Sequence, residues 1–117
     1  MPKKWKQTRL PVEAPTSESN PHESKIYGAE LSGNALSIDL HALDTGSGIH
    51  SLDLFLHSAF MSHTEVVKVI HGRGTGKMRD AVRAFLQSEP LVELFRDSHN
   101  PTEMSGVTYV VLAKSSA

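Results

Sequence analysis

The chain has 117 residues, of which 38% are hydrophobic, with no cysteine and a formal net charge of −1. This length fits one small domain, and the lack of cysteine excludes disulfide scaffolds, cysteine-bound metals and thiol nucleophiles. No apolar run approaches the roughly 20 residues that a transmembrane helix needs, so we expect a cytoplasmic protein with no membrane partner.

Residues 1–35 have the composition of a disordered tail. They contain four of the six prolines, among Ser, Thr, Glu and Asn, and show no hydrophobic period. Such a segment lacks the apolar surface that would offset the entropy lost on ordering. The alternative is an arm that binds a partner through Trp5 and the basic residues around it. We therefore expect the folded domain over 36–113, with 114–117 as a short C-terminal tail.

The first predicted elements are a strand, a helix and a second strand. Apolar residues alternate with polar ones over 36–41, which is typical of a strand with one buried face. Small and turn-forming residues fill 44–48, and residues 49–60 carry the apolar stripe of an amphipathic helix. The β-branched run within 65–70 predicts a central strand.

A helix and two strands follow a glycine-rich segment at 71–76. Apolar spacing predicts the helix over 78–86, and Pro90 limits its extension. Residues 92–96 and 107–112 predict the last two strands, joined by a loop.

The expected order is therefore β-α-β-α-β-β, an α/β fold with a four-stranded mixed sheet. Strands joined through a helix are parallel, whereas the last strand is expected to be antiparallel to its neighbour. Two helices on one face would make a two-layer sandwich, with the other face of the sheet left open.

Three polar side chains are expected at one edge of this sheet. Asp39 and His41 share the face of the first strand that points away from the helices, and His71 closes the second strand. The carboxyl ends of parallel strands meet at one edge, so His41 and His71 should be close, at the edge where open α/β sheets place ligands. Two imidazoles with an orienting carboxylate can supply the acid and base for phosphodiester cleavage. The alternative is that they are solvated strand-end residues.

The segment after His71 is suited to bind phosphate. Its glycines let backbone N–H groups approach an anion, and the following helix begins there. The spacing matches neither a dinucleotide-binding loop nor an NTPase phosphate loop. Basic side chains gather around it although the total charge is nearly neutral. The candidate phosphate- and nucleic-acid-binding residues are Gly72, Arg73, Gly74, Thr75, Gly76, Lys77, Arg79 and Arg83.

These motifs resemble the small MutS-related (Smr) domain family. The strand Leu36-Ser-Ile-Asp-Leu-His41 resembles the family's L-D-L-H motif, and residues 69–76 resemble its H-G-x-G-x-G loop. Met78-Arg79 stands at the family's L-R pair, and residues 105–112 are similar to its closing strand. The resemblance covers residues 36–112.

The resemblance implies a fold like the carboxy-terminal domain of translation initiation factor three. It also implies endonuclease activity, because family members nick or cleave DNA and some cleave messenger RNA at collided ribosomes. By position, the family's functional residues become Asp39, His41 and His71, followed by the loop glycines 72 and 74. Nucleic acid, and the ribosome, are the partners that the family implies.

Two departures from the family pattern favour a non-catalytic module that binds nucleic acid or ribosomes. Ala42 stands where the family commonly has glycine, and the loop 97–106 is poor in glycine. Within the enzyme hypothesis, RNA cleavage by 2′-hydroxyl attack would need no metal. A metal-dependent nick of DNA stays open, since Asp39 could bind a divalent cation, although the residues assign no metal site.

Overall fold

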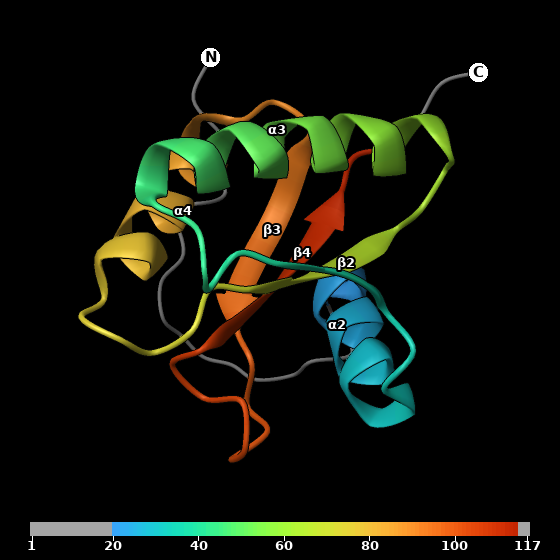
Figure 1. Ribbon diagram of the computed structural model, residues 1–117. Coiled ribbons are helices and arrows are strands. Elements are labelled where there is room, and N and C mark those ends of the chain that lie inside the picture. The colour runs from blue at the N-terminus through green and yellow to red at the C-terminus, as the bar shows by residue number, and fades with distance from the viewer. Residues whose placement is uncertain (1–19, 115–117) are drawn as a thin grey trace.

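The computed structural model describes residues 20–114 and has a four-stranded sheet with helices on both faces (Figure 1). Its strands stand in the order β1-β2-β4-β3. β1 and β2 pair in parallel, and β4 runs antiparallel to both of its neighbours. The expected mixed sheet and, from β1 onward, the expected order β-α-β-α-β-β are thus confirmed. The strands are β1 (Leu36–Asp39), β2 (Val66–Ile70), β3 (Val92–Asp97) and β4 (Val107–Leu112).

Helices α3 (Thr45–Met61) and α4 (Lys77–Ser88) cover one face, as expected. α3 begins within residues 44–48, which the sequence placed in a turn. The reason is local: the Asp44 side chain caps the helix by accepting a hydrogen bond from Ser47 N at 2.8 Å. This cap offsets the low helix propensity of the two glycines in the first turn.

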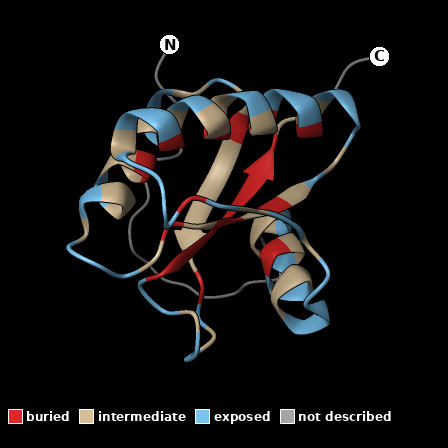
Figure 2. Cartoon of the chain, in the orientation of Figure 1, coloured by how far each residue is buried: buried red, intermediate tan, exposed pale blue. Residues whose placement is uncertain are grey.

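The main core lies between these helices and the sheet. Fully buried members include Leu40, Leu52, Leu56, Val69 and Val82. Leu36 is the exception to the expected alternation, because it is half exposed at the start of the edge strand. All six residues of β4 are buried, so both faces of this central strand are covered (Figure 2).

The second face is covered by α2 (Pro21–Ser32), which corrects two predictions at once. Residues 20–35 are not a disordered tail, and the sheet is not open on that side. Asn20 caps the helix by accepting from His22 N at 3.0 Å, and Gly33 ends it with a φ of 71°. The remaining predicted tail residues, 1–19 with Trp5 and 115–117, lie outside the described residues.

The sequence shows no helical hydrophobic pattern over α2, because this helix contacts the sheet with only one fully buried apolar side chain. Ile26 packs in a second core with Val107, Tyr109 and Val111. The rest of the contact is polar and centres on Arg96 of β3. Its Nε donates to Glu23 Oε1 at 2.9 Å, and its two terminal nitrogens donate to the two Glu30 oxygens at 3.0 Å.

No helix in the described part of the chain is long and apolar enough to cross a membrane.

Candidate functional site

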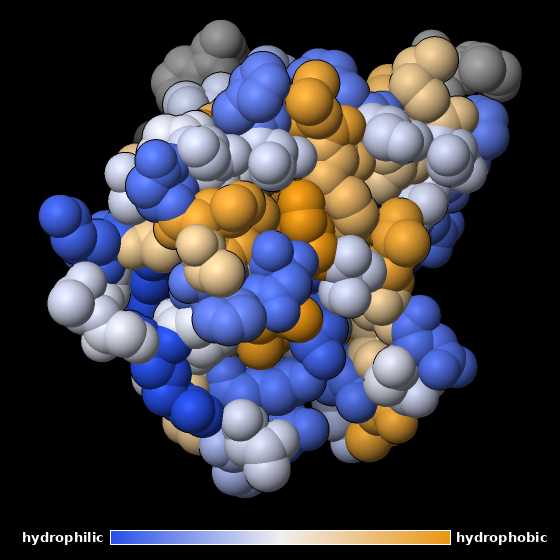
Figure 3. Space-filling model, viewed as in Figure 1, coloured by the Kyte–Doolittle hydropathy of each residue, from blue (hydrophilic) through white to orange (hydrophobic). Residues whose placement is uncertain are grey.

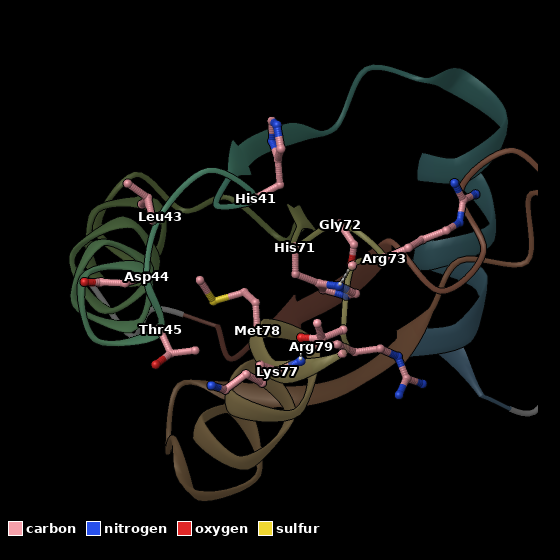
Figure 4. Close-up of a pocket in the computed structure, with 13 residues that line it drawn as sticks. His41, Leu43, Asp44, Thr45, His71, Gly72, Arg73, Lys77, Met78 and Arg79 are labelled. Atoms are coloured by element: carbon pink, nitrogen blue, oxygen red, sulfur yellow. Dashed lines mark hydrogen bonds between the residues drawn. The ribbon is translucent and has the colours of Figure 1, made fainter.

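A cleft of about 470 Å³ opens at the edge of the sheet that the sequence indicated. The carboxyl ends of β1 and β2 meet there, together with the first residues of α3 and α4 (Figure 4). Of the predicted site residues, the cleft brings together both histidines, the glycine loop and three of the basic side chains. Asp39 and Arg83 are not part of its lining. The lining residues are His41, 43–45 and 71–79.

His41 and Asp39 form a pair on the rim of this cleft. His41 Nδ1 lies 2.5 Å from Asp39 Oδ1, and the same oxygen accepts from the His41 backbone N–H at 3.0 Å. These hydrogen bonds from His41 lower the pKa of Asp39, so the carboxylate is ionised at neutral pH. An ionised partner requires the proton on Nδ1, which leaves the Nε2 lone pair free. The His41 side chain is 62% exposed, so this nitrogen can reach a substrate.

His71 has a different environment from the one predicted. It is 3% exposed and both ring nitrogens face partners inside the protein. Nδ1 lies 3.1 Å from the Gly72 carbonyl oxygen and Nε2 lies 2.9 Å from Thr108 Oγ1. In Figure 4 its ring points toward the glycine loop, whereas the His41 ring points out of the cleft. The two histidines are therefore neighbours along the rim but do not converge as an exposed acid–base pair.

A chain of hydrogen bonds links His71 through Thr108 to the Asp97 carboxylate, which was not among the predicted site residues. Thr108 Oγ1 donates to Asp97 Oδ1 at 3.0 Å, so the same hydroxyl oxygen accepts from His71 Nε2–H. Burial lowers the pKa of His71, and the neutral ring has a single N–H for its two acceptors. Protonation would satisfy both contacts and would place positive charge near Asp97. Nothing in the local sequence marks Asp97 or Thr108, because they join His71 only through the pairing of β3, β4 and β2.

Asp97 also engages two of the arginines predicted to bind phosphate. Arg79 Nη2 donates to Asp97 Oδ2 at 2.5 Å, and Arg83 Nη1 lies 3.4 Å from Oδ1. Burial opposes ionisation of Asp97, but the hydrogen bonds from Arg79 and Thr108 outweigh it and keep its pKa low. Arg79 and Arg83 are thus already paired with a carboxylate, and their contact with phosphate stays a prediction. Arg83 also lies over the Phe95 ring, 5.5 Å from its centre.

Arg73 is also held, because its guanidinium donates to the carbonyl oxygens of Met104 and Thr102 at 2.9 and 3.1 Å. Gly106 O accepts from both His71 N and Gly72 N at 3.0 Å. These hydrogen bonds hold the glycine loop against residues 102–106, which precede β4. The predicted donor Gly72 N–H is therefore already occupied.

The remaining loop donors are free. Within the described structure, the backbone N–H groups of residues 73–76 make no hydrogen bond. Gly74 and Gly76 have φ values of 31° and 90°, a region that glycine adopts easily. Gly76 is also the N-cap of α4 and offers no side chain to its first turn. Lys77 is exposed and forms no ion pair with a described residue, so four amides, one helix N-terminus and one ammonium group remain for an anion.

The described residues contain no group of three or more His, Asp or Glu side chains arranged to hold a metal ion.

Comparison with known proteins gives consistent matches over the part of the chain that contains this cleft. The model of the Smr domain matches residues 38–113. The endonuclease MutS2 of Caldicellulosiruptor saccharolyticus is 42% identical over 77 residues, which are 66% of this chain and 10% of that protein. The MutS2 of Aquifex aeolicus is 38% identical over 76 residues. The chain thus spans about a tenth of the length of these relatives.

Two solved structures share the fold. The Smr domain of Thermus thermophilus MutS2 superposes with a TM-score of 0.66 at 30% identity, covering 68% of this chain and 99% of that one. YdaL, a stand-alone small MutS-related protein from Escherichia coli, also has a TM-score of 0.66, at 20% identity over 90% of this chain and 82% of that one. The predicted fold class and family resemblance are confirmed.

Proposed function

The chain belongs to the Smr domain family, and on that premise we propose that it cleaves phosphodiester bonds in RNA with His41 as the general base. The observation that carries this proposal is the His41–Asp39 pair beside the glycine loop. A side-chain Cβ at Gly72 would lie 3.0 Å from His41 Cβ, so His41 stands directly against the first residue of that loop. A phosphate on the loop would therefore lie near the base of the His41 side chain, and the exposed ring, which points out of the cleft here, would have to turn inward to bring Nε2 to it.

The phosphate is held by groups that have no other partner. The free amides of residues 73–76 and the N-terminus of α4 direct positive potential into the cleft. Lys77 adds a full charge there. These donors can also stabilise the extra negative charge that develops on the phosphoryl oxygens during attack.

The reaction begins when His41 Nε2 takes the proton from the ribose 2′-hydroxyl. The 2′-oxygen forms a bond to phosphorus, and the bond from phosphorus to the 5′-oxygen breaks. The leaving oxygen takes a proton from water, and the hydroxide formed takes the proton back from the His41 imidazolium. The products are a 2′,3′-cyclic phosphate and a 5′-hydroxyl. Asp39 holds the ring and stabilises the imidazolium that forms.

His71 acts as a positioning residue in this proposal. Its contact with the Gly72 carbonyl sets the start of the glycine loop, and its contact with Thr108 links that loop to the sheet. Because its ring is buried and each nitrogen faces a partner inside the protein, the acid role predicted from the sequence passes to solvent.

The test compares His41→Ala with His57→Ala. His57 is a matched control because it is an exposed histidine with Nδ1 3.2 Å from Asp53 Oδ1, and it lies outside the cleft. Substrates are naked RNA, stalled collided ribosomes and branched DNA, each with and without chelator. We expect His41→Ala to lower RNA cleavage by about 10²–10⁴-fold, the usual contribution of a general base, and His57→Ala to leave it unchanged.

A single 2′-deoxy substitution at the cleaved position tests the nucleophile. Undiminished cutting of that RNA, or cutting that requires a metal and prefers branched DNA, would overturn the 2′-hydroxyl mechanism. RNA that is bound by wild type but never cut would support the binding module instead.

A further inference from the structure

The cleft has a second half that the phosphate-binding groups do not use. Away from the glycine loop, the cleft is lined by residues 43–45 and by Met78, so two apolar side chains, Leu43 and Met78, belong to its lining. Leu43 is 41% exposed. On the face shown in Figure 3, apolar side chains lie directly beside strongly hydrophilic ones over this part of the molecule.

Met78 holds a defined position in this part of the lining. A Cβ on Gly48 of α3 would lie 2.5 Å from the Met78 methyl carbon and 2.9 Å from its sulfur. The thioether can therefore cross from α4 to α3 only because residue 48 has no side chain. The Met78 thioether therefore lies between the first turns of the two helices and lines the cleft, and thioethers interact favourably with aromatic rings.

Charge separates the two halves of the cleft. Asp44 Oδ1 caps α3 by accepting from Ser47 N at 2.8 Å, and hydrogen bonds from Ser47 lower the pKa of this exposed carboxyl, which is therefore ionised at neutral pH. A carboxylate repels phosphate, but its remaining lone pairs can accept hydrogen bonds from the amino and imino groups of bases. The phosphate thus belongs on the side of Lys77 and the base belongs on the side of Asp44, with the Thr45 hydroxyl between them.

We propose that Leu43, Asp44, Thr45 and Met78 form a subsite for one unpaired nucleobase of the strand whose phosphate lies on the glycine loop. This inference rests on the proposed function and names its substrate class as single-stranded or locally unpaired RNA. A cleft of about 470 Å³ has the size of a single-ligand pocket and does not admit a base pair still stacked in a helix.

The test measures binding of labelled single-stranded RNA by fluorescence anisotropy, with a series in which one base at a time is removed. Leu43→Ala and Met78→Ala are compared with Leu54→Ala, an exposed leucine on α3 outside the cleft. Removing a stacked base costs roughly tenfold in affinity. We expect that loss for both cleft variants on intact RNA, and no loss for Leu54→Ala.

The removed-base series locates the subsite. Removal of the base at one position should weaken binding to wild type about tenfold. When that base is absent, Leu43→Ala should cause no additional loss of affinity. A fully paired duplex should bind Leu43→Ala and wild type equally. Asp44→Ser keeps a capping side chain and should alter which base is preferred at that position.

Two outcomes would overturn the subsite. In the first, removal of the base affects binding equally at every position. In the second, Leu43→Ala binds RNA as tightly as Leu54→Ala. In both, RNA is still cut and the cutting still depends on His41. If wild type neither binds nor cuts RNA, the proposed function itself fails. Because Met78 is partly buried, unfolding curves accompany each variant, and Leu43→Glu at the exposed position provides a second variant that must also weaken binding.

Discussion

Replacing Arg96 by methionine tests how α2 is held on the sheet. The Arg96 side chain is 14% exposed and binds Glu30, which is 9% exposed, through two parallel hydrogen bonds. Removing one partner of a buried ion pair costs about 3–5 kcal/mol, because the other charge stays buried without compensation. Glu30 keeps the hydrogen bond from His99 N at 2.7 Å, so we expect the lower end, about 3 kcal/mol.

The assay is urea unfolding at neutral pH, followed by far-UV circular dichroism. Lys25→Met is the matched control, because the Lys25–Glu65 pair has a 3.8 Å separation and side chains that are 30% and 57% exposed. Such a pair contributes at most about 1 kcal/mol. The double variant Arg96→Met/Glu30→Met should recover most of the loss, since it removes both charges together.

Acid provides a second measurement on the same contact. The hydrogen bond from Arg96 lowers the pKa of Glu30 from its ordinary 4.5. A depressed folded-state pKa gives stability that is present above the ordinary value and is lost as pH falls through the folded one. The gap between wild type and Arg96→Met should therefore shrink below about pH 4.5. An Arg96→Met protein as stable as Lys25→Met, or a gap that widens in acid, would refute this account of α2.

Three further predictions concern the site. Thr108→Val removes the acceptor for His71 Nε2–H and should lower the His71 pKa further, which NMR titration of the ring would show; an unchanged pKa contradicts the proposed link. Gly72→Ala, at a φ of 79° and with its Cβ 3.0 Å from a side chain, should destabilise by about 2 kcal/mol. In contrast, Gly46→Ala in α3 meets no atom within 4 Å and should be neutral or stabilising by up to about 1 kcal/mol; similar urea midpoints for the two would contradict the strain. Asp97→Asn should destabilise by about 1–2 kcal/mol at neutral pH, and the difference should vanish in acid as wild-type Asp97 is protonated, since its folded pKa is lowered.

Local patterns in the sequence predicted the parts of this protein that depend on local physics. Alternation and helical periodicity identify the strands and the helices α3 and α4, and chain connectivity makes β1 and β2 parallel. Asp39 and His41 are two residues apart on one strand, and this spacing predicts that their side chains meet. The glycines of 72–76 predict a loop with positive φ values, which the structure has. These features need few or no distant partners.

Tertiary structure alone decided which polar groups remain free. α2 has a cap and a stop at Asn20 and Gly33, but its stability depends on Arg96, which is 66 residues from Glu30. His71 is buried because Thr108, 37 residues away, comes to lie on the neighbouring strand. The sequence gives no partner for Arg79 and Arg83, but in the fold both pair with Asp97 at the end of β3. A side chain's type and spacing can be read locally, whereas its solvation and its partner depend on strand order, and these decide whether it carries chemistry or holds the fold together.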